Sequence, residues 1–84
     1  MPDVKRRSAN TYSINLDQWI GLQITRRRTE IELTKEDLAA MTGCTVAEIQ
    51  SFEFAWRRPK PAQILLLANT LGVRVSYFFD GYQF

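Results

Sequence analysis

Two helix-start signals stand only eleven residues apart in this chain, and they restrict its fold more than any other feature. Thr34 is followed three residues later by Asp37, and Thr45 is followed three residues later by Glu48. In such a pair the threonine hydroxyl accepts a hydrogen bond from the first turn of the helix, while the carboxylate accepts one from the backbone N–H of the threonine. Each pair therefore predicts the start of a helix.

A glycine between the two signals predicts a sharp turn. Gly43 supplies the left-handed backbone conformation that commonly ends a helix, so the first helix of the pair is expected to end at about Thr42. The second is expected over residues 46–54. Ala39 is small where two steeply crossing helices must approach closely. This spacing is that of a helix-turn-helix over residues 34–54.

The flanking segments predict three more helices. Apolar residues at Leu16, Ile20, Ile24 and Ile31 follow the spacing of an amphipathic helix, expected over residues 17–29. A nearly all-apolar helix is expected over residues 61–71, buried around most of its circumference, and a short fifth helix over residues 75–82. The sequence thus predicts an all-α, five-helix domain.

Composition excludes several classes of function. The chain has 84 residues, one cysteine and no histidine, so no internal disulfide, Cys/His zinc site or histidine-based catalytic triad is possible. No glycine-rich phosphate loop or set of paired carboxylates is visible. We therefore expect no enzyme, metal or cofactor. No apolar run is long enough for a membrane span or signal peptide, which favours the cytoplasm.

The charge is unevenly distributed. Residues 1–28 carry a balance of +4 and residues 57–84 a balance of +3, whereas residues 29–56 carry −5 with Lys35 as their single cation. A polyanion bound by this chain must therefore be held mainly by the flanks of the helix pair.

The helix pair and its flanks resemble the lambda-repressor and Cro family, also called Xre-type. The resemblance rests on LTKEDLAAMTGCTVAEIQSFE and on PAQILLLANTLGVRVSYFFDG, and it covers residues 16–81. It implies a lambda-repressor-like domain over residues 16–84, preceded by a basic flexible arm over residues 1–15. It also implies a dimeric transcription regulator bound to double-stranded DNA on the nucleoid, with the helix over residues 46–54 in the major groove.

A helical wheel identifies the side chains that would meet the bases. Ile49, Phe52 and Glu53 are expected to face inward. The residues expected to read bases are Val46, Ala47, Gln50 and Ser51, with Phe54 on the same arc. An amide such as that of Gln50 bonds adenine in two places, a hydroxyl makes one adaptable bond, and the small apolar side chains touch a thymine methyl.

Phosphate contacts are expected from the helix starts and the basic segments. The candidates are Thr34, Lys35, Thr45, Arg57, Arg58 and Lys60, together with Lys5, Arg6 and Arg7 in the arm.

Several residues allow both a structural and a functional interpretation. By the resemblance, Arg28 and Glu53 form a partly buried ion pair, which we prefer over a DNA contact for Arg28. Glu48 is interpreted as a cap rather than a partner for cytosine. Trp56 is expected to fold over the core rather than stack on DNA, and Cys44 to be a half-buried filler rather than a redox sensor.

Five aromatic residues crowd the last eight positions, more than one short helix can bury. We therefore expect a homodimer interface. Its candidate residues are Tyr77, Phe78, Tyr82 and Phe84.

Two functions remain open. The first is a repressor at an operator, with the variant that Glu36 and Asp37 contact RNA polymerase and activate. The second is a protein-interaction module, antitoxin-like or antirepressor-like, in which base recognition is weak. The apolar Val46, Ala47 and Phe54 favour the second.

Overall fold

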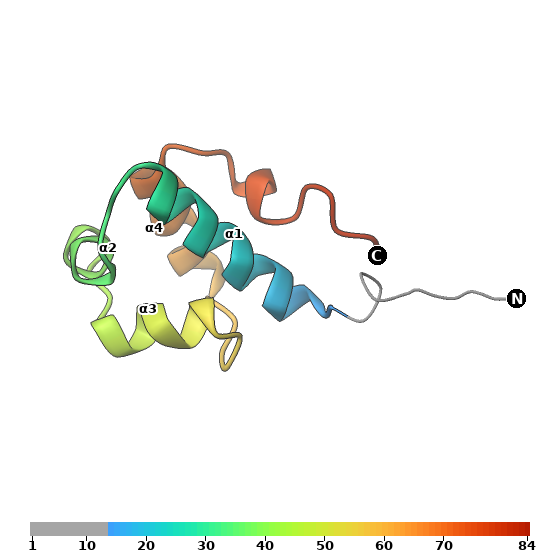
Figure 1. The fold of residues 1–84 in the computed structure, drawn as a ribbon, viewed down its shortest axis with the longest axis horizontal. Coiled ribbons are helices and arrows are strands. Elements are labelled where there is room, and N and C mark those ends of the chain that lie inside the picture. Colours follow the sequence, from blue (N-terminus) through green and yellow to red (C-terminus); the bar gives the residue numbers. More distant parts are fainter. Residues whose placement is uncertain (1–13) are drawn as a thin grey trace, which may run out of the picture.

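The computed structural model describes residues 14–84, which form four α-helices and one 3-10 helix (Figure 1). In chain order these are α1 (Leu16–Glu30), α2 (Lys35–Thr42), α3 (Val46–Glu53), α4 (Pro61–Leu71) and the 3-10 helix η3 (Val75–Phe78). The arm residues Lys5, Arg6 and Arg7 lie outside the described residues. No helix within residues 14–84 is long and apolar enough to cross a membrane.

The helix starts are fixed by neighbouring side chains. Thr34 and Asp37 form a reciprocal cap at α2, and Thr45 and Glu48 form another at α3, as predicted. Asn15 and Gln18 form a third at α1, which starts at Leu16, one residue before the predicted start. In each cap, side-chain oxygens accept hydrogen bonds from two backbone N–H groups that the first turn would otherwise leave without a partner.

Gly43 ends α2 in the left-handed region, with φ of +75°, and nothing lies within 4 Å of the position a Cβ would take. Glycine is needed there because of the backbone conformation and not because of crowding. The turn brings α3 across α2 as the helix-turn-helix requires.

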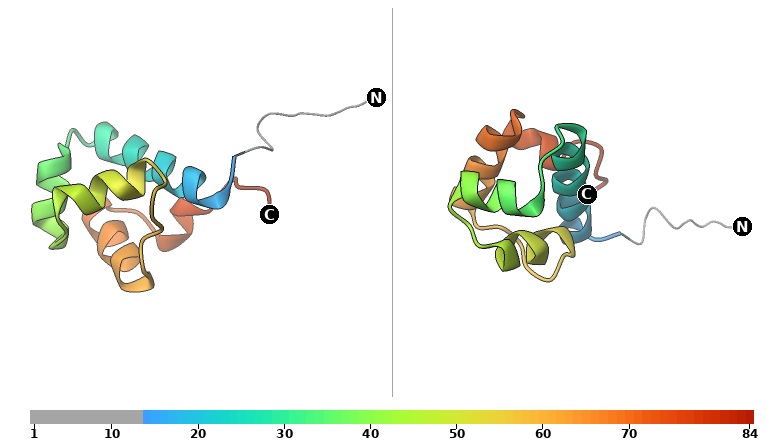
Figure 2. Two further views of the ribbon diagram at one scale, coloured as in Figure 1. Left: turned by 90° about the horizontal axis from the view of Figure 1, so that it is seen from below. Right: turned by 60° about the vertical axis from the view of Figure 1, so that its left-hand side comes forward.

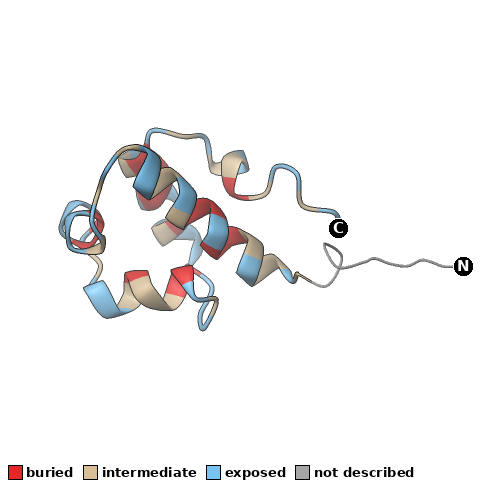
Figure 3. Ribbon diagram, in the orientation of Figure 1, coloured by how far each residue is buried: buried red, intermediate tan, exposed pale blue. Residues whose placement is uncertain are grey.

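The core lies where α1 meets α3, α4 and η3, with α2 closing one end (Figure 1; Figure 2). The buried faces turn inward from all five elements (Figure 3). The core consists of Ile20, Ile24, Leu38, Ala39, Ile49, Phe52, Ile64, Leu67, Ala68, Leu71 and Phe78. Seen from below, α3 lies in the foreground with α1 and α4 on either side (Figure 2, left).

Gly21 allows α1 and α3 to touch. A Cβ at this position would lie 2.6 Å from the carbonyl oxygens of both Phe52 and Glu53. Only a residue without a side chain permits so close an approach of two helix backbones. This contact fixes the end of α3 against the middle of α1.

The predicted fifth helix is wrong in type and length. Only Val75–Phe78 is helical, as a single 3-10 turn, because no side chain caps its start and Gly81 takes φ of +88°, which a continuing helix cannot accept. The described residues therefore contain four α-helices and not five.

The prediction that α4 is buried around most of its circumference is also wrong. Ile64, Leu67, Ala68 and Leu71 face the core, but Leu65 and Leu66 are 57% and 46% exposed. The described elements pack against only one side of α4, which leaves an apolar strip on the other side.

Candidate nucleic-acid interface

The outer face of α3 is open. Val46 is 37% exposed and Ala47 is exposed, while Gln50 and Ser51 are half-buried and Ile49 lies in the core. The Ser51 hydroxyl donates a 2.8 Å hydrogen bond to the Ala47 carbonyl, so its oxygen keeps its acceptor capacity for a ligand. The four residues predicted to read bases thus lie along a single helix whose inner side is fixed in the core.

A bidentate ion pair holds α3 to α1. Arg28 donates from Nε to Glu53 Oε2 at 2.7 Å and from Nη2 to Glu53 Oε1 at 3.1 Å. Its Nη1 donates to the Leu33 carbonyl at 2.8 Å. The Arg28 side chain is 12% exposed and that of Glu53 only 2%. Hydrogen bonding to Glu53 raises the pKa of Arg28 against the opposing effect of burial. Arg28 is therefore occupied inside the domain.

The cap of α2 lowers the pKa of one of its two residues, Asp37. Asp37 accepts a 3.0 Å hydrogen bond from the Thr34 backbone N–H, and the Thr34 hydroxyl accepts one from Asp37 N–H at 2.9 Å. Hydrogen bonds from Thr34 lower the pKa of the Asp37 carboxyl. Both residues are exposed at the helix start, where backbone N–H groups also suit a phosphate.

The cations beside α3 are partly held by neighbours. Lys35 Nζ lies 4.7 Å from the centre of the Phe54 ring. Arg57 lies 3.6 Å from Glu48, which also caps α3, and Arg58 Nε donates to Asp17 at 2.5 Å. Both arginine side chains remain 56% exposed, and Lys60 is exposed. A row of cations thus runs from the start of α2 to the loop after α3.

Trp56 does not fold over the core, contrary to the prediction. Its side chain is 70% exposed and packs edge-on against Phe54, with ring centroids 5.2 Å apart. The cause is Ala55, whose φ of +63° reverses the chain after α3. Trp56 N–H then bonds the Ser51 carbonyl at 2.9 Å and Ala55 N–H bonds the Phe52 carbonyl at 3.2 Å, which closes the helix end and turns Trp56 outward.

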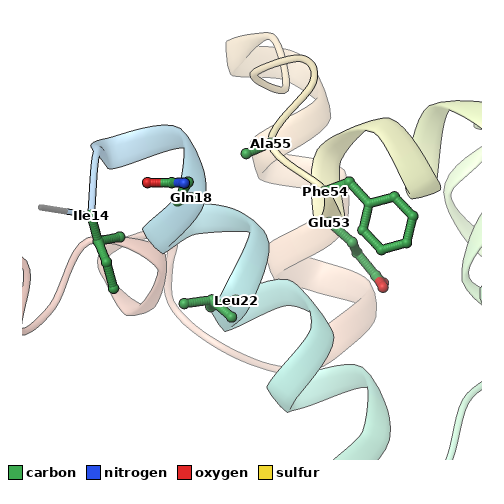
Figure 4. A pocket seen from close by; sticks show the side chains of 6 residues that line it. All are labelled: Ile14, Gln18, Leu22, Glu53, Phe54 and Ala55. Atoms are coloured by element: carbon green, nitrogen blue, oxygen red, sulfur yellow. The ribbon is translucent and has the colours of Figure 1, made fainter. Parts of the chain in front are cut away.

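A shallow apolar pocket of about 220 Å³ lies between α1 and the end of α3 (Figure 4). Ile14, just before α1, and Gln18 and Leu22 of α1 line it on one side, and Glu53, Phe54 and Ala55 line it on the other. Phe54 therefore lines this pocket and also packs against Trp56.

The C-terminal aromatic residues do not form one exposed patch. Phe78 is fully buried in the core, so this predicted interface residue is unavailable to a partner. Tyr77 and Tyr82 are half-buried, the latter against Trp19 with ring centroids 6.0 Å apart. Phe84 is 90% exposed. A single 3-10 turn with the bend at Gly81 folds most of these rings back onto α1.

Cys44 is half-buried, as expected for a filler.

Four features of the structure are not predicted by the sequence patterns. They are the backbone contact at Gly21, the cation over the ring of Phe54, the left-handed Ala55, and the 2.8 Å hydrogen bond from Arg27 Nε to the Leu71 carbonyl at the end of α4. The only local signal among them is a glycine inside a helical pattern, which often marks close packing.

A known family and several regulators match this chain. The family model described as Helix-turn-helix (HTH_3) matches residues 24–78. A transcriptional regulator in the ATPase CF(0) region of Rhodospirillum rubrum is 29% identical over 80 residues, which are 95% of this chain and 70% of the relative. HTH-type transcriptional regulators from Rickettsia conorii and Sinorhizobium medicae are 30% and 31% identical, over 79% and 77% of this chain. The chain spans about half the length of these two relatives, 53% and 47%.

Solved structures share the fold. The restriction-modification controller protein C.AhdI from Aeromonas hydrophila superposes with a TM-score of 0.73 at 25% identity, over 75% of this chain and 96% of that one. A variant of the controller protein C.Esp1396I gives 0.72 at 25% identity, over 80% and 87%. Together with the paired helices around Gly43, these matches show that the chain belongs to the lambda-repressor-like, or Xre-type, helix-turn-helix family of transcription regulators.

Proposed function

We propose that this protein is a sequence-specific repressor that binds operator DNA as a homodimer, in the cytoplasm and on the nucleoid. The observation that carries the proposal is the open outer face of α3, held rigidly by Gly21 and the Arg28–Glu53 pair, with Lys35 against Phe54 at its C-terminal end. A helix with a fixed inner side and an open outer side that carries both polar and small apolar side chains suits insertion into the major groove.

Base recognition is assigned to a small set of side chains. In this proposal Gln50 reads adenine through its amide, Ser51 makes one hydrogen bond, and Val46 and Ala47 contact thymine methyl groups. Phosphates are held by the cations and helix starts around α3, and by the arm. These residues are Thr34, Lys35, Thr45, Arg57, Arg58, Lys60, Lys5, Arg6 and Arg7. The likeness to two controller proteins supports a regulator of this size acting through DNA.

Dimerisation is proposed through the exposed apolar strip of α4, together with the C-terminal aromatic residues. Leu65, Leu66 and Phe84 are exposed, and exposed apolar side chains of this kind are typical of a subunit interface. Tyr77 and Tyr82, which are half-buried, are proposed to contribute to it. A dimer would set two copies of α3 one helical turn of DNA apart, about 34 Å, on a near-palindromic operator.

A specific observation favours a second candidate function. Two of the base-reading positions, Val46 and Ala47, are apolar and exposed, and Glu36 and Asp37 lie exposed on α2. An interaction module that retains the scaffold but recognises bases weakly, or an activator that presents these carboxylates to RNA polymerase, would have this surface. Both alternatives predict weak discrimination between DNA sequences or an additional protein partner.

The salt dependence of DNA binding tests the proposal. With a pool of random-sequence duplexes, log affinity measured by fluorescence anisotropy should fall against log salt with a slope of about −5 if five or six phosphates are contacted. Lys60→Gln should reduce the slope by about 1, whereas Arg26→Gln, which removes an exposed cation on α1 paired with Glu30, should leave it unchanged. No binding in dilute buffer, or a slope near zero, would contradict DNA binding.

A selection of bound genomic fragments completes the test. The repressor proposal predicts a recurring near-palindromic sequence, and loss of residues 1–10 should weaken binding to it. Fragments without a common sequence would support the interaction module instead.

A further inference from the structure

Two aromatic rings stand out of the surface at the end of α3. Phe54 and Trp56 are 51% and 70% exposed and pack edge-to-face with ring centroids 5.2 Å apart, and we name this pair the aromatic ridge. Large rings lose favourable burial energy when left in water, so an exposed pair marks a contact surface. The left-handed Ala55 holds Trp56 away from the core, so the domain itself does not cover the ridge.

Cations border the ridge on both sides. Lys35 Nζ lies over the Phe54 ring at 4.7 Å, and Arg57 and Arg58 follow Trp56 in the chain. Glu48 and Asp17 each pair with one of these arginines, whose side chains nevertheless stay 56% exposed. Each guanidinium has five N–H donors, so a carboxylate at one edge leaves donors for an anion. One cation therefore lies against the Phe54 ring, and two more follow Trp56 in the chain and keep donors for an anion.

We infer that the aromatic ridge is a docking surface for the sugar–phosphate backbone of duplex DNA, an inference that rests on the proposed function. A DNA strand presents apolar deoxyribose faces next to anionic phosphates, which suits a surface on which exposed rings are accompanied by cations. The Trp56 ring packs on a deoxyribose and its Nε1–H donates to a phosphate oxygen, while Lys35 and Arg57 take the flanking phosphates.

A second copy of the chain fits this surface poorly. In a two-fold dimer the same patch meets itself, so Lys35, Arg57 and Arg58 of one copy would face the same cations of the other. Like charges brought together in this way oppose association. The charge around the ridge thus favours a polyanion over a second protomer.

The ridge also has a role that α3 alone lacks. Its contact carries no base information, since every nucleotide presents the same sugar and phosphate. It sets how far α3 is inserted and in which register, and it adds affinity where Val46 and Ala47 make only small apolar contacts. Trp56 is in this sense a positioning residue for the base-reading helix.

Tryptophan fluorescence tests the inference directly, because the chain has two tryptophans, Trp19 and Trp56. In the full chain with Trp19→Phe, Trp56 is the single tryptophan, and excitation at a wavelength that tyrosine does not absorb gives emission from Trp56 alone. Adding a random-sequence duplex pool should shift this emission to shorter wavelength and reduce its quenching by acrylamide, with the same midpoint as the anisotropy titration. Circular dichroism and a melting curve establish that the variant is folded.

Affinity variants give an independent measurement. Trp56→Ala should weaken DNA binding about tenfold, in the range reported for loss of an aromatic contact to nucleic acid, and Trp56→Phe should lose less. Met41→Ala is the matched control, since Met41 is an exposed apolar side chain on α2 outside the ridge. It should bind like the unmodified chain.

The possible outcomes separate the two proposals. If the unmodified chain binds DNA while Trp56 emission does not change and Trp56→Ala binds equally well, the ridge inference is overturned and the proposed function stands. If Trp56 emission instead changes with protein concentration in the absence of DNA, the ridge is a protein contact and the inference is likewise overturned. If neither the unmodified chain nor any variant binds DNA, the proposed function is contradicted, and the ridge inference that rests on it is overturned as well.

Discussion

Ala55 ends α3 in a conformation that alanine adopts at a cost. Its φ of +63° lies in the left-handed region, where the Cβ crowds the backbone and glycine is favoured. We expect Ala55→Gly to raise the free energy of unfolding by about 1 kcal/mol. Glycine relieves the steric strain of the left-handed conformation, and this gain exceeds the entropy cost of its more flexible unfolded chain. Urea denaturation measures this change. A loss of stability would show that the Ala55 methyl group packs usefully in the pocket beside Phe54.

Glu53 is a nearly buried carboxylate that neutralises the nearly buried Arg28. Replacing it with glutamine removes the bidentate partner of Arg28, whose side chain is only 12% exposed, and leaves a nearly buried cation. We expect Glu53→Gln to cost about 3 kcal/mol of unfolding free energy. Denaturant unfolding of the two proteins checks this.

A surface ion pair provides the comparison for Glu53. Glu30→Gln breaks pairs with Arg26 and Arg27 at 3.4 and 3.5 Å that are well exposed to solvent. It should change the unfolding free energy by less than about 0.5 kcal/mol. Equal changes in the unfolding free energy for Glu53→Gln and Glu30→Gln would mean that the buried Arg28–Glu53 pair stabilises the fold no more than an exposed pair does.

Gly21 sets the distance between two helices. A Cβ at this position meets two carbonyl oxygens of α3 at 2.6 Å, and these are backbone atoms that cannot rotate away. Although alanine is the better helix former by about 1 kcal/mol, overpacking should dominate, and we expect Gly21→Ala to destabilise the protein by about 2 kcal/mol. It should also weaken DNA binding, because α3 is displaced. A more stable variant in thermal unfolding would contradict this contact.

The helices that the sequence patterns predict well are those with local start and stop signals. The caps at Thr34 and Thr45 and the turn at Gly43 each act within a few residues, so α2 and α3 begin and end where expected. The 3-10 turn at Val75–Phe78 lacks such a signal, and the spacing of its aromatic residues is also compatible with a longer α-helix. The sequence patterns also do not predict the exposed strip on α4, because the apolar content of a helix does not show which of its faces other elements will cover.

The same limit applies to the candidate site. The positions proposed to read bases follow from helical periodicity alone, and in the structure they lie on the outer side of α3, two exposed and two half-buried. The outward Trp56 depends on the sign of one backbone angle at Ala55, and alanine gives no hint of a positive φ. Contacts between distant segments, such as Lys35 with Phe54, depend on how the helices cross and not on local sequence.

At the scale of the whole molecule, the apolar strip on α4 predicts a dimer. Leu66→Glu places a charge in the proposed interface and should convert a dimer at micromolar concentration into a monomer, as measured by analytical ultracentrifugation. DNA affinity should fall with it, because two linked copies of α3 bind more tightly than one. Leu22→Glu, on the exposed face of α1, should leave the oligomeric state unchanged. A monomeric unmodified protein that binds DNA as a monomer would rule out the interface.

The reciprocal caps give the chain another property. In α1, α2 and α3 the first turn is closed by a residue pair only three positions apart, and the Gln63 side chain accepts a hydrogen bond from Lys60 N–H at the start of α4. None of these bonds needs a partner from elsewhere in the molecule, so the helix boundaries are specified locally. Helices as short as α2 and α3 are marginal in isolation, so during synthesis they become stable only when α4 arrives to complete the core.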